Sequence, residues 1–158
     1  MKNLRRQLEL LNNYTFTDAE WKRLFDGQIA GENMTIEDKT IIVQQDPILS
    51  IKLDNGDSKN IKLLDKRNIH NNRLQVINQY VPTGGTHNNR YDVTILVNGL
   101  PLVHIELKRR GVSIKEAFNQ INRYQRESFW AGRALFDYVQ IFVISNGTQT
   151  KYYSNTTR

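Results

Sequence analysis

The chain has 158 residues, about one domain, and 39% hydrophobic residues, enough for one core. It has no cysteine, which excludes disulfides and thiolate metal sites, and its three scattered histidines argue against structural zinc. No apolar run approaches the roughly 18 residues of a membrane span, so we expect a cytoplasmic protein with no membrane partner. The net charge of +6 fits a polyanionic partner such as nucleic acid, although a solvated basic surface explains it equally well.

The first part of the chain shows helical patterns. Leucines at helical spacing predict a helix over residues 3–11. Thr17 with Glu20 forms a capping box, which predicts the start of a second helix and gives this glutamate a structural role. A further short helix is expected in or beside residues 35–45. We therefore expect helices to precede the strands.

From residue 48 onward the pattern changes to the alternation typical of strands. Ser113 with Glu116 forms a capping box that predicts a helix over residues 114–129. The polar loop 82–89 is mobile by composition. This order predicts a single domain of mixed α/β or α+β class, with helices packed on a mixed sheet. The predicted strands cover residues 48–54, 60–65, 73–81, 91–97, 100–108, 138–145 and 150–154.

Two phosphate-binding motifs are missing from the sequence. There is neither a G-x-x-x-x-G-K-[ST] loop nor a G-x-G-x-x-G fingerprint. We therefore expect that this chain by itself neither binds nor hydrolyses ATP.

The triplet Glu-x-Lys occurs three times, beginning at Glu20, Glu37 and Glu106. The first two fall in or beside predicted helices, and only the third lies in a predicted strand. A bare triplet arises readily by chance in a lysine-rich chain. The neighbouring residues therefore decide whether the third one carries chemistry.

The hairpin over residues 91–108 supplies that context. In its second strand Val103, Ile105 and Leu107 form an apolar face, and His104, Glu106 and Lys108 lie on the other. A two-residue Asn98-Gly99 turn would mix the faces of the two strands. A three-residue loop over residues 98–100 keeps one clean apolar face and places Asp92 directly opposite Glu106.

Two carboxylates opposed in this way repel each other unless a cation lies between them. Their β-carbons would be about 5 Å apart, and a metal ion is the simplest such cation. Lys108 projects from the same face and adds a positive charge. The alternative is an exposed polar face on which Asp92 and Glu106 pair with Lys108 and nearby arginines. We interpret His104, on the same face, as a neighbour of the site, because Mg²⁺ prefers oxygen ligands.

The following helix brings a second group of polar residues. Gln120 and Tyr124 are four residues apart and share a helical face with Glu116. A core-facing tyrosine beside an amide is the alternative to a functional pair. Basic residues also concentrate just after the hairpin, at Lys108, Arg109, Arg110, Lys115, Arg123 and Arg126.

The chain resembles the PD-(D/E)xK nuclease superfamily, in its RecB-like branch. The resemblance lies in the order and spacing of Asp92, Glu106, Lys108, Gln120 and Tyr124. The fold that this implies is a restriction-endonuclease-like mixed sheet flanked by helices.

Longer stretches are similar to the N-terminal nuclease domain of the restriction (R) subunit of type I restriction-modification enzymes. The resemblance covers nearly the whole chain and is most specific in "NRYDVTILVNGLPLVHIELKRRGVSIKEAFNQINRYQRESF". Further matching segments are "FTDAEWKRLF", "LLDKRNIHNNRLQVINQY" and "QIFVISNGTQTKYYSNTT".

The resemblance implies a role for each matching residue. Asp92 and Glu106, with the main-chain carbonyl of Leu107, would coordinate Mg²⁺. Lys108 would position the attacking water and offset charge at the phosphate. Gln120 and Tyr124 would support the site. Hard carboxylate oxygens suit Mg²⁺, so hydrolysis of DNA phosphodiester bonds is the expected reaction.

The resemblance also implies partners. Double-stranded DNA is the expected substrate, with Arg109, Arg110, Arg123 and Arg126 as its contacts by proximity. Modification and specificity subunits, and an ATP-driven motor, would belong to the intact subunit, of which we expect this chain to be a fragment. The family has a further acidic residue on a helix upstream of these motifs, and we assign that role to no residue here, Glu9 included.

The sequence is compatible with three functions. The first is an endonuclease domain that cuts duplex DNA with Mg²⁺ and without its own sequence preference, since no groove-reading motif is visible. The second is a catalytically silent DNA-binding or interaction module that keeps the nuclease fold. The third is an RNA-directed nuclease of the same fold.

Overall fold

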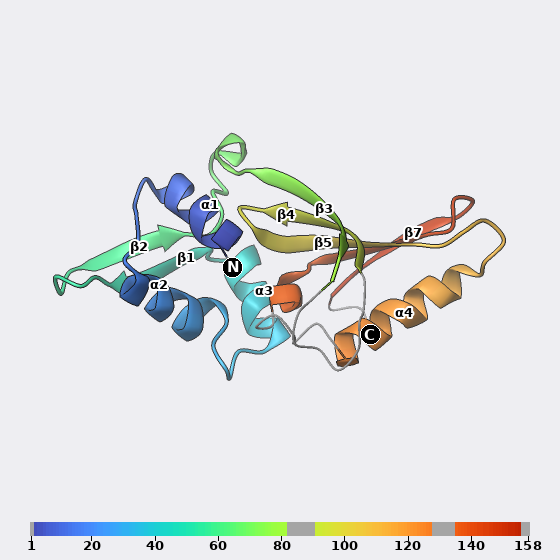
Figure 1. Ribbon diagram of the computed structural model, residues 1–158, viewed down its shortest axis with the longest axis horizontal. Coiled ribbons are helices and arrows are strands. Elements are labelled where there is room, and N and C mark those ends of the chain that lie inside the picture. The colour runs from blue at the N-terminus through green and yellow to red at the C-terminus, as the bar shows by residue number, and fades with distance from the viewer. Residues whose placement is uncertain (1, 82–90, 128–134, 156–158) are drawn as a thin grey trace. The chain divides into compact units, whose positions relative to one another are not determined.

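The computed structural model describes residues 2–81, 91–127 and 135–155 (Figure 1). The predicted loop 82–89 lies outside this part of the chain. The helices are α1 Lys2–Asn12, α2 Asp18–Leu24, α3 Ile36–Gln44 and α4 Ile114–Glu127, with a π-helix Phe25–Ile29 and 3₁₀ turns Ile69–Asn71 and Leu135–Tyr138. The strands are β1 Ile48–Lys52, β2 Ser58–Lys62, β3 Leu74–Tyr80, β4 Tyr91–Val97, β5 Leu100–Leu107, β6 Ile141–Ser145 and β7 Thr150–Ser154. The predicted mixed α+β class is confirmed.

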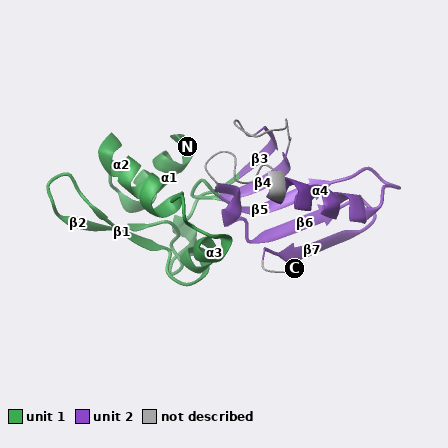
Figure 2. Ribbon diagram, turned by 90° about the horizontal axis from the view of Figure 1, so that it is seen from below, with its two compact units in different colours: residues 1–75, 97–100 green, residues 76–96, 101–158 purple. Residues whose placement is uncertain are grey.

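The chain divides into two compact units (Figure 2). Unit 1 comprises residues 1–75 and 97–100, and unit 2 comprises residues 76–96 and 101–158. Each helix of the described ranges is too short or too polar to cross a membrane.

Unit 1 contains α1, α2 and α3, with α1 packed on β2 and α2 on β1 of the antiparallel hairpin β1–β2. The predicted capping box of α2 is present: Thr17 Oγ1 accepts from the Glu20 N–H, and Glu20 Oε2 accepts from the Thr17 N–H. The buried Glu20 also accepts hydrogen bonds from the Tyr14 hydroxyl and the Asp54 N–H. Hydrogen bonding, first from the Thr17 N–H, lowers the pKa of this carboxyl. The first Glu-x-Lys triplet is therefore structural, as predicted.

A capping box that the sequence reading did not single out opens α3. Thr35 Oγ1 accepts from the Asp38 N–H at 3.1 Å, and Asp38 Oδ2 accepts from the Thr35 N–H at 2.9 Å. The hydrogen bond from Thr35 lowers the pKa of Asp38. Asp38 is the middle residue of the second Glu-x-Lys triplet, which is helical as expected. Only the third triplet therefore lies on a strand.

Unit 2 contains most of a five-stranded sheet of order β3-β4-β5-β6-β7. Strands β5 and β6 pair in parallel, with Glu106 beside Ile144, and β6 pairs with β7 in antiparallel fashion. A parallel pair needs a crossover connection, which here contains α4 (Figure 1). A core of mostly apolar and aromatic residues joins the helix to the sheet: Tyr91, Ala117, Ile121, Tyr124, Phe136, Val139, Phe142 and Ile144.

The predicted three-residue loop in the β4–β5 hairpin is wrong. Strand β4 ends at Val97 and β5 begins at Leu100, so the turn is Asn98-Gly99 alone. Both turn residues have positive φ, 51° and 85°. This is the type I′ combination that an Asn-Gly pair adopts readily and that matches the twist of paired strands.

One consequence of the predicted three-residue loop is nevertheless observed, namely that Thr94 and His104 lie opposite each other. Thr94 Oγ1 lies 3.3 Å from His104 Nδ1, so these side chains share a face, as the three-residue register required. Leu100 and Pro101 are both buried, which breaks the alternation of β5 by one residue. Such a break is where a proline is tolerated in a strand. The turn is thus shorter than predicted, while Thr94 and His104 still share a face.

The face of β5 that faces the core was also predicted wrongly. His104 and Glu106 are completely buried, whereas Leu107 on the supposed apolar face is 47% exposed. The aromatic rings of the core cover the polar face: Tyr91 lies 5.4 Å and Phe136 6.3 Å from the His104 ring. The carboxylate and imidazole are therefore part of the interior of unit 2.

Gly99 is a position where we expect a large loss of stability. A β-carbon there would lie 2.7 Å from the Leu4 Cα, a backbone atom, and its φ of +85° is unfavourable for any side chain. We expect Gly99→Ala to lower the free energy of unfolding by about 3 kcal/mol or more in urea denaturation. Gly56→Ala is the matched control, because Gly56 has a φ of +91° and nothing within 4 Å, and it should cost about 1 kcal/mol. Equal losses in the two variants would show that the contact with Leu4 is unimportant.

Candidate active site

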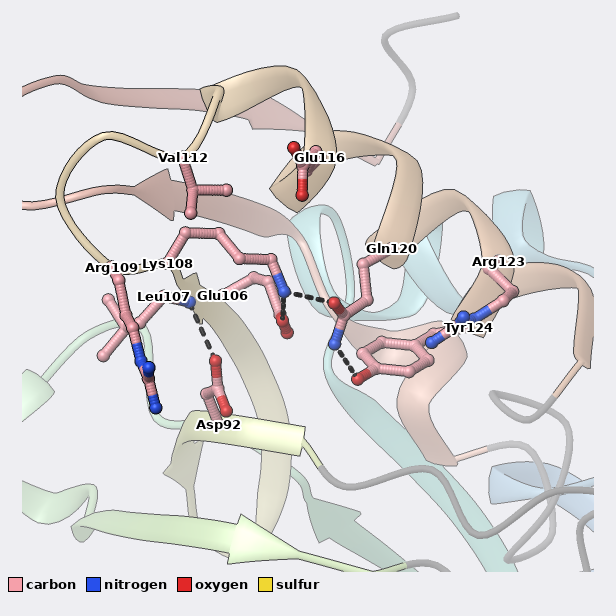
Figure 3. A pocket seen from close by; sticks show the side chains of 10 residues that line it. All are labelled: Asp92, Glu106, Leu107, Lys108, Arg109, Val112, Glu116, Gln120, Arg123 and Tyr124. Carbon is pink, nitrogen blue, oxygen red and sulfur yellow. Dashed lines mark hydrogen bonds and ion pairs between the residues drawn. The ribbon is translucent and has the colours of Figure 1, made fainter.

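One pocket of unit 2, of about 490 Å³, brings together most of the predicted site residues (Figure 3). It lies where β4 and β5 meet α4. Its lining consists of Asp92, Glu106, Leu107, Lys108, Arg109, Val112, Glu116, Gln120, Arg123 and Tyr124. Asp92 and Glu106 thus share a pocket, although no direct opposition across the strands is established.

Glu106 is the most unusual residue of the pocket. Its side chain is 1% exposed, and its Oε1 lies 3.2 Å from Lys108 Nζ. The other oxygen, Oε2, accepts no hydrogen bond from any residue that the structure describes. His104 Nε2 lies 3.7 Å from this oxygen. A buried carboxylate oxygen without a donor is costly, and a cation is the group that would offset that cost.

Asp92 is held by the backbone of the neighbouring strand. Its Oδ2 accepts a hydrogen bond of 2.9 Å from the Leu107 N–H. The donating N–H belongs to the peptide bond between Glu106 and Leu107, so Asp92 is bonded to the backbone next to the other acid. Figure 3 shows the Asp92 carboxylate pointing towards Leu107 at the end of β5. This bond fixes the carboxylate at the mouth of the pocket.

Lys108 connects the strand to the helix. Its ammonium donates to Glu106 Oε1 and to Gln120 Oε1, and Gln120 Nε2 in turn donates to the Tyr124 hydroxyl (Figure 3). The predicted pairing of Gln120 and Tyr124 on one helical face is confirmed. Burial chiefly raises the pKa of Tyr124, and the nearby negative charges add to this. The phenol therefore stays protonated and can donate a hydrogen bond into the pocket.

The core-facing position of Tyr124 is confirmed, and its hydroxyl also bonds to Gln120. Its ring belongs to the core of unit 2, with its centroid 4.9 Å from that of Tyr91, while its hydroxyl reaches the pocket through Gln120. Helix α4 therefore both contributes to the core and carries Gln120 and Tyr124, two of the residues hydrogen-bonded in series with Lys108.

The predicted DNA-contacting arginines separate into two groups. Arg109 and Arg123 line the pocket. Arg110 does not; its Cγ lies 3.4 Å from the place where Gly147 would carry a β-carbon, in the β6–β7 turn. The side chain of Arg126 lies outside the described part of the chain.

Glu116 and Glu9, which the sequence analysis also considered, lie in different units of the structure. Glu116, exposed in the first turn of α4, lines the pocket as a third carboxylate, and its helical position next to Gln120 was the signal for it. Ser113 precedes this helix, and its hydroxyl accepts from the Lys115 N–H at 3.3 Å. Glu9 belongs to unit 1, where its Oε1 accepts from Arg5 and from the Phe16 N–H.

The donor set suits a hard divalent cation. Asp92, Glu106 and the Leu107 carbonyl offer oxygen atoms only, which is the preference of Mg²⁺. Within the described ranges, no cluster of three or more His, Cys, Asp or Glu side chains is close enough to bind one ion. Two carboxylates with water completing the shell is the usual arrangement for Mg²⁺, which keeps several of its waters. The residues present therefore fit this ion.

Comparison with known proteins places the whole chain in one family. The model of the type I restriction enzyme R protein N terminus matches residues 1–158. The chain is 51% identical to the type I restriction enzyme EcoprrI endonuclease subunit of Escherichia coli over 158 residues, all of this chain and 50% of that protein.

More distant relatives agree with this match. The identity is 43% over 150 residues with the type I restriction enzyme SsaAORF53P endonuclease subunit of Staphylococcus saprophyticus, covering 95% of this chain and 15% of the relative. It is 33% over 110 residues with a putative type I restriction enzyme endonuclease subunit of Methanocaldococcus jannaschii, covering 65% of this chain and 10% of the relative. The chain thus spans half or less of these relatives. It belongs to the family of type I restriction enzyme R protein N termini.

Proposed function

We propose that this chain is a Mg²⁺-dependent endonuclease that hydrolyses DNA phosphodiester bonds, the cleavage module of a type I restriction-modification enzyme. The observation that carries the proposal is the completely buried Glu106, with one oxygen paired to Lys108 and the other without a hydrogen-bond donor among the described residues. The relatives are named endonuclease subunits, which supports the same conclusion.

The residues of the pocket would have three different roles: binding the metal ion, positioning the water and supporting Lys108. Asp92, Glu106 and the Leu107 carbonyl would hold Mg²⁺, which when bound would acidify a water and stabilise charge on the phosphate. Lys108 would place its ammonium beside that water and the phosphate. Gln120 and Tyr124 would hold the ammonium in place, because the chain of hydrogen bonds from Lys108 to Tyr124 runs through the amide.

DNA would be held mainly through its phosphates. Arg109 and Arg123 at the pocket supply positive charge, and Arg110 and Arg126 stay predicted DNA contacts. Binding of this type carries no sequence preference and weakens steeply with salt. Choice of target would then lie with the specificity subunit of a complex that also contains modification subunits. The place of action would be the cytoplasm, and residues 1–158 would act as one endonuclease domain with its chemistry in unit 2.

The test is nicking of supercoiled plasmid by the 158-residue chain, with Mg²⁺ and with EDTA. We expect open-circular DNA only with Mg²⁺, and a rate that falls as salt is raised. Linear double-stranded RNA of the same length is the competitor that separates a DNA enzyme from an RNA enzyme. Mg²⁺-independent DNA binding without any nicking would contradict the proposal and favour a silent nuclease-fold module.

A further inference from the structure

A fully buried imidazole lies behind the carboxylate that the proposed function uses. His104 Nε2 is 3.7 Å from Glu106 Oε2, and both side chains are at most 1% exposed. On the other side of the ring, Nδ1 is 3.3 Å from the hydroxyl of Thr94, which is itself 1% exposed. A polar line therefore runs from Thr94 on β4 through His104 to Glu106 on β5.

The aromatic core holds the imidazole in one orientation. The ring makes edge-to-face contacts with Tyr91, Tyr124, Phe136 and Phe142, at centroid distances of 5.4, 6.3, 6.3 and 6.4 Å. Packing of this kind leaves a histidine few alternative rotamers. Its two nitrogens therefore point in fixed directions, one towards the threonine and one towards the carboxylate.

The orientation of the imidazole allows Nε2–H to act as a hydrogen-bond donor towards Glu106. If the Thr94 hydroxyl donates to Nδ1, the neutral ring carries its hydrogen on Nε2 and directs it at the carboxylate. The present 3.7 Å is about half an ångström longer than a hydrogen bond. Hydrogen bonds of catalytic groups are often long in the free enzyme and shorten when the site is filled.

We propose that His104 is a positioning residue that, itself oriented by Thr94, holds the Glu106 carboxylate in the rotamer that binds the divalent cation. This inference rests on the proposed function of the same pocket. Outer-shell partners of this sort fix the direction of a ligand, and their loss typically lowers metal affinity by about 10–100-fold.

Mn²⁺ titration, followed by calorimetry and by electron paramagnetic resonance, tests this on the 158-residue chain. We expect His104→Leu to weaken Mn²⁺ binding by about 10–100-fold. His104→Gln, whose amide can donate towards Glu106, should recover most of that loss. Val139→Ala is the control, because Val139 belongs to the same core but is not one of the rings packed around His104, and its Mn²⁺ affinity should stay within about twofold of the wild type.

Thr94→Val provides a second variant with nearly the shape of the original residue. We expect a smaller loss of Mn²⁺ affinity, and no additional loss when it is combined with His104→Leu, because threonine acts only through the imidazole. Wild-type affinity in Thr94→Val and His104→Leu would overturn this inference and leave the proposed function intact. Equal losses in His104→Leu, His104→Gln and Val139→Ala would also overturn it, since general core damage would then explain them. A wild-type chain that binds no Mn²⁺ would overturn the proposed function itself.

Discussion

Replacing Glu106 by glutamine is expected to reduce Mg²⁺-dependent plasmid nicking by a hundredfold or more. The reason is that the amide cannot supply the negative oxygen that the cation needs, and even outer-shell changes at metal sites cost about 10–100-fold. Glutamine keeps the size of the buried side chain, and Lys108 keeps its bond to Gln120, so the free energy of unfolding should change little. Single-turnover nicking and urea denaturation on the same samples measure both effects.

The chain offers a matched control for this substitution. Glu37 begins the second Glu-x-Lys triplet, on the exposed side of α3. Glu37→Gln removes the same charge at the same motif and should leave nicking unchanged. A Glu106→Gln variant that nicks at the wild-type rate would contradict the role assigned to this carboxylate.

Replacing Lys108 by methionine is expected to abolish nicking and also to destabilise the fold. The Lys108 side chain is 20% exposed and its partner Glu106 only 1%, so the loss of the ammonium leaves a buried carboxylate without its cation. Removing one partner of a buried pair costs about 3 kcal/mol or more. Urea denaturation at neutral pH should therefore show a clear fall in the free energy of unfolding.

The double variant Glu106→Gln with Lys108→Met separates the two effects. It has no unpaired buried charge, so its free energy of unfolding should recover most of the loss seen in Lys108→Met, while its nicking stays abolished. A double variant no more stable than Lys108→Met alone would show that the ion pair is not the source of the loss. Saturating Mg²⁺ should also stabilise Lys108→Met, provided that this variant still binds the ion.

The elements of the fold followed closely from local patterns in the sequence. Leucine spacing and the Thr17 capping box located the first helices, because each of these signals acts over a few residues. The parallel pairing of β5 with β6 was not specified in advance, since it depends on how α4 crosses the sheet. Contacts over long sequence distances were thus the part that local patterns left open.

The grouping of the candidate residues in one pocket agrees with the sequence prediction, but the reason given for it was wrong. Asp92, Glu106, Lys108, Gln120 and Tyr124 do line one pocket, yet the argument from a clean apolar face chose the wrong face of β5. The alternation of apolar and polar residues along a strand defines two faces, but it does not tell which face the rest of the protein covers. Here Phe136 and Phe142, more than 25 residues further along the chain, help to bury His104. The same packing makes Glu106 a buried carboxylate instead of a surface one.

The most direct test of the account is a calorimetric titration of Mg²⁺ into the wild-type chain, Asp92→Asn and Glu106→Gln. The account predicts binding by the wild type and its loss in both variants, because the two carboxylates serve one ion. Wild-type binding that persists unchanged in either variant would contradict it, and would leave the buried Glu106 as a structural partner of Lys108 alone.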